Sequence, residues 1–216
     1  MRVLFKMDKG IIFLSMEILS AGNLDRVIAI LKEGGVIIYP TETTYGIGCD
    51  AANQEAVDRI YKIKKRPLDK PVLALVDSTI MARKYWQWNE RLEKLTQKYW
   101  PGPLTIRARA NDNGLNLARG VVDQDGVVAL RFSDHEIAQK ITSLFGRPLV
   151  STSANIFGDK EVYDSKILMD IFHDQEFQPN AIIDVGTIPF HPPSTLVDAA
   201  GLELKILRQG ELKISL

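Results

Sequence analysis

Short apolar runs alternate with amphipathic stretches along the whole of this 216-residue chain. In the amphipathic stretches, apolar residues recur every three or four positions after a residue that can cap a helix, which predicts α-helices. The expected helix caps are Asn23, Asn53, Asn89 and Asp134, and a further helix is expected over 164–172. The pattern therefore predicts five helices, each with one apolar face.

The apolar runs between these helices are typical of buried strands. Strands are expected at 36–39, 71–76, 104–109, 127–132, 149–150, 181–185, 195–197 and 204–207. Because strands and helices alternate without a repeat or a linker, the sequence predicts one α/β domain. We expect residues 1–20 to be an N-terminal extension or first strand, 21–216 to form the domain, and the polar segment 110–126 to be a mobile loop.

The composition of the chain argues against several classes of protein and several kinds of site. Twenty-seven basic residues balance twenty-seven acidic ones, so no overall charge draws the chain to nucleic acid. The single cysteine, Cys49, excludes an internal disulfide and fits a reducing, cytoplasmic environment. His135, His173 and His191 lack the spacing of metal ligands, so no metal held by protein alone is expected. The apolar run 11–14 is too short for a signal peptide or a membrane span, and no membrane contact is expected.

Hydroxyl groups and cations gather where predicted elements end. The strand 36–39 runs into Pro40-Thr41-Glu42-Thr43-Thr44-Tyr45-Gly46, and the second helix ends in Lys64-Lys65-Arg66-Pro67. Arginine binds carboxylate or phosphate through two parallel bonds, whereas lysine acts as a point charge. Cations at a helix end can also serve only the helix dipole. The alternative that we favour is a site for a small anionic ligand.

A second run of hydroxyls, Ser151-Thr152-Ser153-Ala154-Asn155, follows the strand 149–150. Such residues also form ordinary turns by bonding their own backbone, and this reading stays open. Pro193-Ser194-Thr195 and Arg208-Gln209-Gly210 lie at the ends of two further strands. Open α/β sheets bind ligands in crevices at strand ends, so the two hydroxyl runs are expected to share one crevice.

Several common catalytic signatures are absent from the sequence. There is no phosphate-binding Gly-x-x-x-x-Gly-Lys loop, no Gly-x-Gly-x-x-Gly fingerprint and no serine nucleophile motif. Cys49 has no histidine near it in the sequence and is expected to be a buried thiol. This profile favours chemistry that depends on positioning and charge stabilisation.

These motifs resemble those of the YrdC-like family, the threonylcarbamoyl-adenylate synthases of tRNA modification. The similarity covers roughly 23–210. In the family's order, the matching pieces are Pro40-Thr41-Glu42-Thr43-Thr44-Tyr45-Gly46, Lys64-Lys65-Arg66-Pro67, Trp100-Pro101-Gly102-Pro103-Leu104-Thr105, Leu130-Arg131, Ser151-Thr152-Ser153-Ala154-Asn155, Pro193-Ser194-Thr195 and Arg208-Gln209-Gly210. The resemblance implies a single-domain twisted mixed sheet flanked by helices, with a large concave cleft.

The resemblance also implies a reaction and a set of site residues. L-threonine, bicarbonate and ATP would give threonylcarbamoyl-AMP and pyrophosphate, with Mg²⁺ arriving on ATP. A partner enzyme complex would then transfer the threonylcarbamoyl group to adenosine 37 of tRNA. The implied catalytic residues are Lys64, Arg66, Ser153 and Asn155. The implied threonine-binding residues are Thr41, Thr43, Thr44 and Arg131. The implied ATP-binding residues are Lys64, Ser151, Ser153, Asn155, Ser194 and Arg208.

One departure and three rival functions accompany this resemblance. The stretch 131–135 lacks the proline common in the family, so its turn is expected to differ and His135 receives no role. An RNA-binding module without synthase activity is the first rival, although zero net charge argues against strong nonspecific binding. Weakly active paralogues tend to lack the Lys-x-Arg and Ser-x-Asn pairs found here. The related domain of hydrogenase maturation normally accompanies cysteine-rich zinc modules, which one cysteine excludes.

Overall fold

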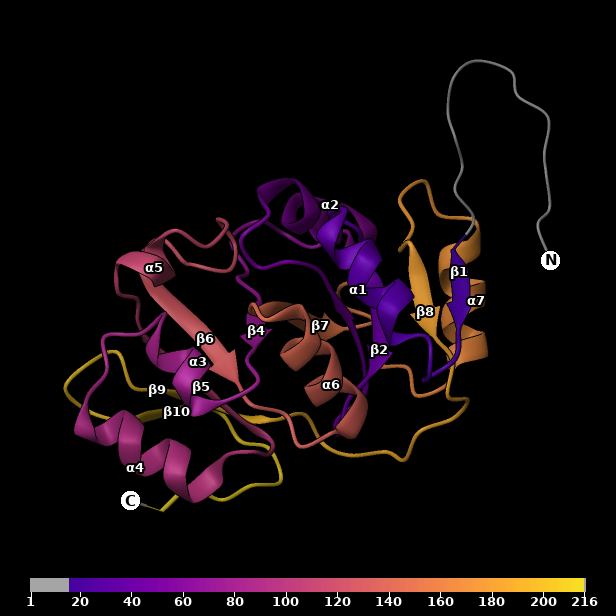
Figure 1. The fold of residues 1–216 in the computed structure, drawn as a ribbon. Coiled ribbons are helices and arrows are strands. Elements are labelled where there is room, and N and C mark those ends of the chain that lie inside the picture. Colours follow the sequence, from indigo (N-terminus) through magenta and orange to yellow (C-terminus); the bar gives the residue numbers. More distant parts are fainter. Residues whose placement is uncertain (1–15, 216) are drawn as a thin grey trace.

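A computed structural model describes residues 16–215 of the chain (Figure 1). Its helices are α1 (Leu24–Lys32), α2 (Gln54–Lys64), α3 (Thr79–Arg83), α4 (Glu90–Tyr99), α5 (Asp112–Leu115), α6 (Glu136–Phe145) and α7 (Ser165–His173). Its strands are β1 (Glu17–Leu19), β2 (Ile37–Pro40), β3 (Tyr45–Gly48), β4 (Leu73–Leu75), β5 (Leu104–Arg109), β6 (Val127–Arg131), β7 (Leu149–Ser153), β8 (Ala181–Ile183), β9 (Thr195–Asp198) and β10 (Lys205–Arg208). No helix in this part of the chain is both long and apolar enough to cross a lipid bilayer.

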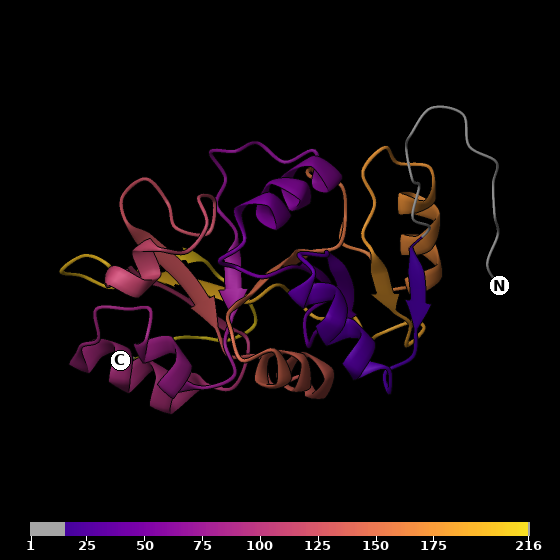
Figure 2. The same cartoon turned by 45° about the horizontal axis from the view of Figure 1, so that its top comes forward.

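All of these strands join one mixed sheet in the order β1-β8-β2-β3-β7-β4-β6-β5-β9-β10. Strand β8 runs parallel to both β1 and β2, whereas β3 is antiparallel to β2 and β7. Figures 1 and 2 show β1, β8 and α7 at one end of the molecule and β9, β10 and α4 at the other. The predicted fold class, a mixed sheet flanked by helices, is therefore confirmed.

Apolar side chains cover both faces of the sheet. On one face, α1 and α6 pack together over the strands, with Val27, Leu31 and Ile141 buried against Ile37. On the other face, the buried side chains of α2, α4 and α7 pack with neighbours such as Ile38. Successive residues of β2 thus point to opposite cores, as the two-residue period of a strand requires. A strand buried on both faces has the continuous apolar run seen in the sequence.

The structure corrects several sequence-based expectations. No strand was expected directly after β2, but the hydroxyl-rich segment there turns back into β3. The segment 110–126 contains α5 and places Leu117, Ala118 and Val121 in the core, which its polar composition did not reveal. Helix α6 begins one residue later than expected. His135, rather than Asp134, is its cap, because the His135 Nδ1 atom accepts a hydrogen bond from the Ile137 amide at 3.3 Å.

The ends of the chain also differ from the sequence-based reading. Asn23 precedes α1 as predicted, but its Oδ1 atom accepts hydrogen bonds from Ser20 rather than from the first turn of the helix. Strand β1 lies within the segment 1–20 that was expected to be an extension or first strand. The apolar run 11–14 lies outside the described residues.

The pairing of β3 with β7 brings the two hydroxyl runs together. Gly46 pairs with Ser153 and Ile47 pairs with Thr152, so the strand entered from Thr44 lies beside the strand that ends at Ser153. Glycine is required where these backbones approach, since a Cβ added at Gly48 would lie 2.1 Å from the Val150 carbonyl oxygen. The hairpin and the exit of β7 therefore form one wall.

The substitution Gly48→Ala is expected to destabilise the fold by about 2 kcal/mol or more, because neither backbone can move without disturbing the sheet. Gly201→Ala is the matched control, since a Cβ there meets nothing within 4 Å. The control should stay within about 0.5 kcal/mol of the original chain. Urea denaturation measures both free energies of unfolding. Equal stability of the two variants would contradict the close approach at Gly48.

Candidate functional site

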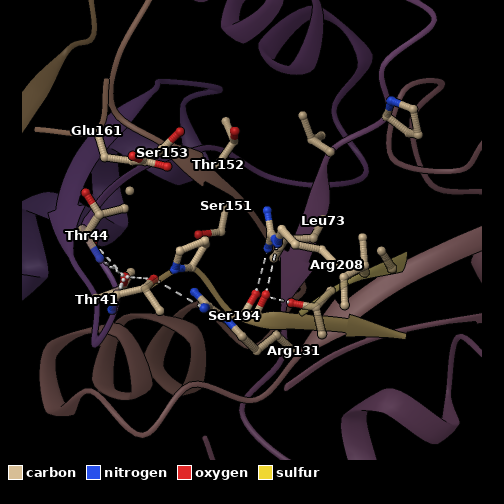
Figure 3. A pocket seen from close by; sticks show the side chains of 18 of the residues that line it. Thr41, Thr44, Leu73, Arg131, Ser151, Thr152, Ser153, Glu161, Ser194 and Arg208 are labelled. Atoms are coloured by element: carbon tan, nitrogen blue, oxygen red, sulfur yellow. Dashed lines mark hydrogen bonds between the residues drawn. The ribbon is translucent and has the colours of Figure 1, made fainter. Parts of the chain in front are cut away.

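A cavity of about 300 Å³ opens beside the end of β2, the start of β3 and the end of β7 (Figure 3). Nine of the residues that the sequence proposed for the site line this cavity: Thr41, Thr43, Thr44, Arg66, Arg131, Ser151, Ser153, Ser194 and Arg208. In Figure 3, Thr41 and Thr44 lie on one side, Ser194 and Arg208 on the other, and Ser151 between them. Below we call this cavity the cleft. The shared crevice expected from the two hydroxyl runs is present.

The turn between β2 and β3 holds its own hydroxyl groups in place. The Thr41 Oγ1 atom donates to the Thr44 carbonyl oxygen at 2.6 Å and lies 3.1 Å from Thr43 Oγ1. Thr41 Oγ1 also accepts a hydrogen bond from the Thr44 amide at 3.3 Å. Thr44 Oγ1 donates to the Val162 carbonyl oxygen at 3.0 Å, which ties the turn to a loop distant in sequence. Local hydrogen bonds of this type are why threonine is favoured in turns, and here they also fix the cleft wall.

Arg131 lies at the base of the cleft and is 4% exposed. Its guanidinium pairs with the Glu42 carboxylate at 3.0 Å and donates to Thr43 Oγ1 at 3.4 Å. Ser133 donates a further hydrogen bond to Glu42. The Nε atom of Arg131 is buried without a hydrogen-bond partner among the described residues. A buried cation with an unused donor can bind an anion that enters the cleft.

Lys64 stands behind the cleft wall rather than in it. Its side chain is 1% exposed and does not belong to the residues that line the cleft. The Nζ atom donates to the carbonyl oxygens of Ser153 and Asn155, the latter at 2.6 Å, and to Asn155 Oδ1 at 3.2 Å. Asn155 is also buried, and its Oδ1 atom accepts a hydrogen bond from the Ser153 hydroxyl at 2.6 Å. The Lys-x-Arg and Ser-x-Asn pairs therefore meet, with Lys64 and Asn155 behind the wall and Ser153 in it.

Arg66 reaches the cleft because helix α2 ends abruptly. Lys65 adopts a left-handed conformation with φ of 51°, and the Arg66 amide donates back to the Tyr61 carbonyl oxygen at 2.9 Å. The Arg66 side chain then donates to the carbonyl oxygens of Lys70 and Pro71 at 2.8 and 3.0 Å. These bonds hold the guanidinium at the cleft, next to the wall that Lys64 braces.

Ser194 and Arg208 form the opposite side of the cleft. Arg208 donates to the Ser194 carbonyl oxygen at 3.0 Å and to its hydroxyl at 3.1 Å. The Ser194 hydroxyl also lies 2.8 Å from Thr105 Oγ1. Since Ser194 belongs to the segment before β9 and Arg208 ends β10, this side depends on the pairing of the last two strands.

Sequence reasoning missed several residues that line the cleft. They include Thr105, Arg107, Asp123, Glu161, Tyr163 and His191. Arg107 is held between Asp123 and Asp198, with Oδ2 of Asp198 at 3.1 Å. Glu161 and Tyr163 belong to the segment between Asn155 and α7, which carries no motif. Only Thr105 had a signal, because it closes the Trp-Pro-Gly-Pro-Leu-Thr motif.

No group of three or more His, Cys, Asp or Glu side chains within 16–215 is arranged to hold a metal ion. Two carboxylates, Glu161 and Asp123, line the cleft, and Arg107 already pairs with Asp123. A Mg²⁺ ion that keeps its waters and is carried by phosphates needs at most one or two carboxylates. The donor set therefore fits a magnesium ion that arrives with a nucleotide.

Known proteins match most of this chain in sequence. Residues 29–210 match the Sua5/YciO/YrdC family model, which is described as "Telomere recombination". The threonylcarbamoyl-AMP synthase of Vibrio cholerae is 37% identical over 192 residues, which is 87% of this chain and 97% of that protein. The synthase of Pyrococcus abyssi is 32% identical over 188 residues, or 85% of this chain and 53% of its own length.

Solved structures show the same fold. The crystal structure of P. abyssi Sua5 complexed with L-threonine aligns with a TM-score of 0.82 and 29% identity, over 91% of this chain and 58% of that one. Escherichia coli YciO aligns with a TM-score of 0.78 at 22% identity, over 91% of this chain and 95% of its own, a likeness in fold alone. By its sequence and its fold, this chain belongs to the Sua5/YciO/YrdC family.

Proposed function

We propose that this protein is an enzyme, a threonylcarbamoyl-AMP synthase that acts as a nucleotidyltransferase. It joins L-threonine, bicarbonate and ATP to give threonylcarbamoyl-AMP and pyrophosphate. The proposal rests mainly on four arginines that line one cleft together with many hydroxyl groups. Arg107 is held between two aspartates, which leaves Arg66, Arg131 and Arg208 as the candidates for binding anions. The curated relatives that share most of this chain carry the same activity in their names.

The reaction requires two anions to be held together in a confined space. The amine of threonine and bicarbonate form a carbamate, with loss of water, and a carbamate oxygen then attacks the α-phosphorus of ATP. The bond between the α-phosphorus and the oxygen that bridges to the β-phosphate breaks, and pyrophosphate leaves with that oxygen. Anions at contact distance repel strongly unless cations offset the charge, so Arg66, Arg131 and Arg208 are suited to this step. Thr41, Thr43 and Thr44 are proposed to bind threonine, with Arg131 taking its carboxylate.

ATP is proposed to bind along the wall that contains Ser151 and Ser153, with Ser194 and Arg208 facing it from the other side. Mg²⁺ would be held mainly by phosphate oxygens and water, with Glu161 as a carboxylate of the cleft that could contribute. When bound, the ion neutralises phosphate charge. The protein residues orient the nucleotide and exclude water from the carbamate.

Lys64 and Asn155 are proposed to act from behind this wall. The pKa of Lys64 is lowered to about 7, mainly by burial and also by the charge of the nearby Arg66, while Glu161 opposes the shift. A charged Lys64 braces the backbone of Ser153 and Asn155 and adds positive potential to the cleft. Its role in the reaction is therefore positional and electrostatic.

The product implies a place in tRNA modification. Threonylcarbamoyl-AMP is a mixed anhydride, so a second enzyme or enzyme complex must take the threonylcarbamoyl group, which we propose passes to adenosine 37 of tRNA in the cytoplasm. The rival proposal, an RNA-binding protein without synthase activity, is favoured by no described feature beyond local basic residues. The chain has no net charge to drive nonspecific RNA binding.

Purified protein is expected to release pyrophosphate from ATP only when threonine and bicarbonate are both present. Mass spectrometry should detect threonylcarbamoyl-AMP in the same reaction. The dependence on both substrates follows because the carbamate is the nucleophile. RNA binding with no pyrophosphate release would instead support the RNA-binding module.

Arg66→Ala is expected to lower turnover by roughly a hundredfold or more, comparable to the loss of one transition-state hydrogen-bond donor. Arg83→Ala is the matched control, because Arg83 lies on α3 and pairs with Glu93 away from the cleft. The control should keep full activity. Turnover of Arg66→Ala near that of the original chain would remove Arg66 from the mechanism.

The buried Lys64 is expected to make stability depend on pH. The folded-state pKa near 7 lies below the ordinary value of 10.5, so between these values the unfolded chain binds the extra proton. The folded state therefore becomes less stable as pH falls toward 7. The equilibrium constant for unfolding rises by up to about tenfold for each pH unit of that fall. Urea denaturation between about pH 7 and 9 should show this trend in the original chain and lose it in Lys64→Met. Parallel curves for the two proteins would contradict the shifted pKa.

A further inference from the structure

An exposed aromatic ring lies against the guanidinium of Arg66. The carbon at the centre of the guanidinium is 5.2 Å from the centroid of the Phe157 ring. Phe157 is 40% exposed and follows the Ser153–Asn155 motif on the same loop. Its amide donates to the Lys64 carbonyl oxygen at 2.7 Å, so the loop is attached to the end of α2 at this point.

Apart from an interaction with the Tyr61 side chain, the polar contacts of Arg66 run along one edge of its guanidinium. The Nε and Nη2 atoms donate to the carbonyl oxygens of Lys70 and Pro71, two successive residues of one loop. A planar guanidinium held along one edge can still tilt about that edge. The Phe157 ring supplies a further restraint on this tilt, because a cation prefers to lie over the negative face of an aromatic ring.

We propose that Phe157 is a positioning residue that sets the orientation of Arg66 toward the anions of the reaction. This inference rests on the proposed function, in which Arg66 faces those anions. Restraint of the guanidinium before the substrates arrive would lower the entropy lost when Arg66 binds them. Phe157 itself does not line the cleft and has no proposed contact with substrate.

The chain contains a matched control for this proposal. Phe177 is 36% exposed and has the Lys62 ammonium 5.2 Å from its ring centroid. Neither Phe177 nor Lys62 lines the cleft. The two rings thus share exposure and a cation contact, and they differ in whether the cation reaches the cleft.

The test replaces each ring by an apolar side chain that lacks a π face. Phe157→Leu is expected to lower kcat/KM for pyrophosphate release about three- to fivefold, the range for an exposed cation–π contact. Phe157→Tyr should restore the activity, and Phe177→Leu should leave it unchanged. Thermal denaturation of each variant checks that the fold is retained.

A double-mutant cycle separates positioning from a general effect of the loop. In the Arg66→Ala background, Phe157→Leu is expected to cause no further loss, since the residue acts through Arg66. Three results would each overturn the inference: full activity of Phe157→Leu, an equal loss in Phe157→Tyr, or an added loss in the Arg66→Ala background.

A binding measurement distinguishes failure of this inference from failure of the proposed function. If the original chain releases no pyrophosphate, the proposed synthase activity fails. Calorimetric titration with ATP and Mg²⁺ then still compares the ATP affinities of the same variants. Weaker ATP binding by Phe157→Leu than by Phe157→Tyr would support the inference, and equal binding, or no binding by the original chain, would overturn it.

Discussion

The architecture of the cleft depends on one buried ammonium group. Lys64 ends helix α2, and its Nζ atom meets the carbonyl oxygens of Ser153 and Asn155 after strand β7. A buried charge without partners would be very costly, so these oxygens must stay in place for the chain to fold as described. Because Arg66 follows two residues later, the same contact places the guanidinium next to the hydroxyl-bearing wall. Two segments about ninety residues apart thus become one surface.

The rest of the cleft follows a common principle, in which polar groups are held by each other before any ligand arrives. Thr41 bonds within its own turn, Arg131 pairs with Glu42, and Ser194 is held by Arg208. Groups fixed in this way need little rearrangement when charge develops during a reaction. The turn that carries Thr41 joins β2 and β3, which are buried on both faces, whereas Arg208 lies on β10, which is exposed along its length.

The sequence predicted the strands and long helices well, because their apolar periods are clear. It also predicted that the hydroxyl runs of Thr41–Thr44 and Ser151–Asn155 share a crevice. It could not show that Tyr45–Gly48 is a strand, since glycines and hydroxyls there follow the needs of close packing rather than an apolar pattern. The sequence also did not show that Lys64 is buried behind the cleft wall while Arg66 lines the cleft. Which side chain faces the cleft depends on the left-handed Lys65 and on partners distant in sequence.

The central claim is that Lys64 supports the cleft from behind while the arginines face the substrates. A crystal structure with L-threonine, Mg²⁺ and a non-hydrolysable ATP analogue tests it most directly. We expect both ligands in the cleft, Lys64 Nζ still bonded to the carbonyl oxygens of Ser153 and Asn155, and Arg66 in contact with an anionic group. Lys64 released from those oxygens to bind phosphate, or ligands bound elsewhere, would contradict it.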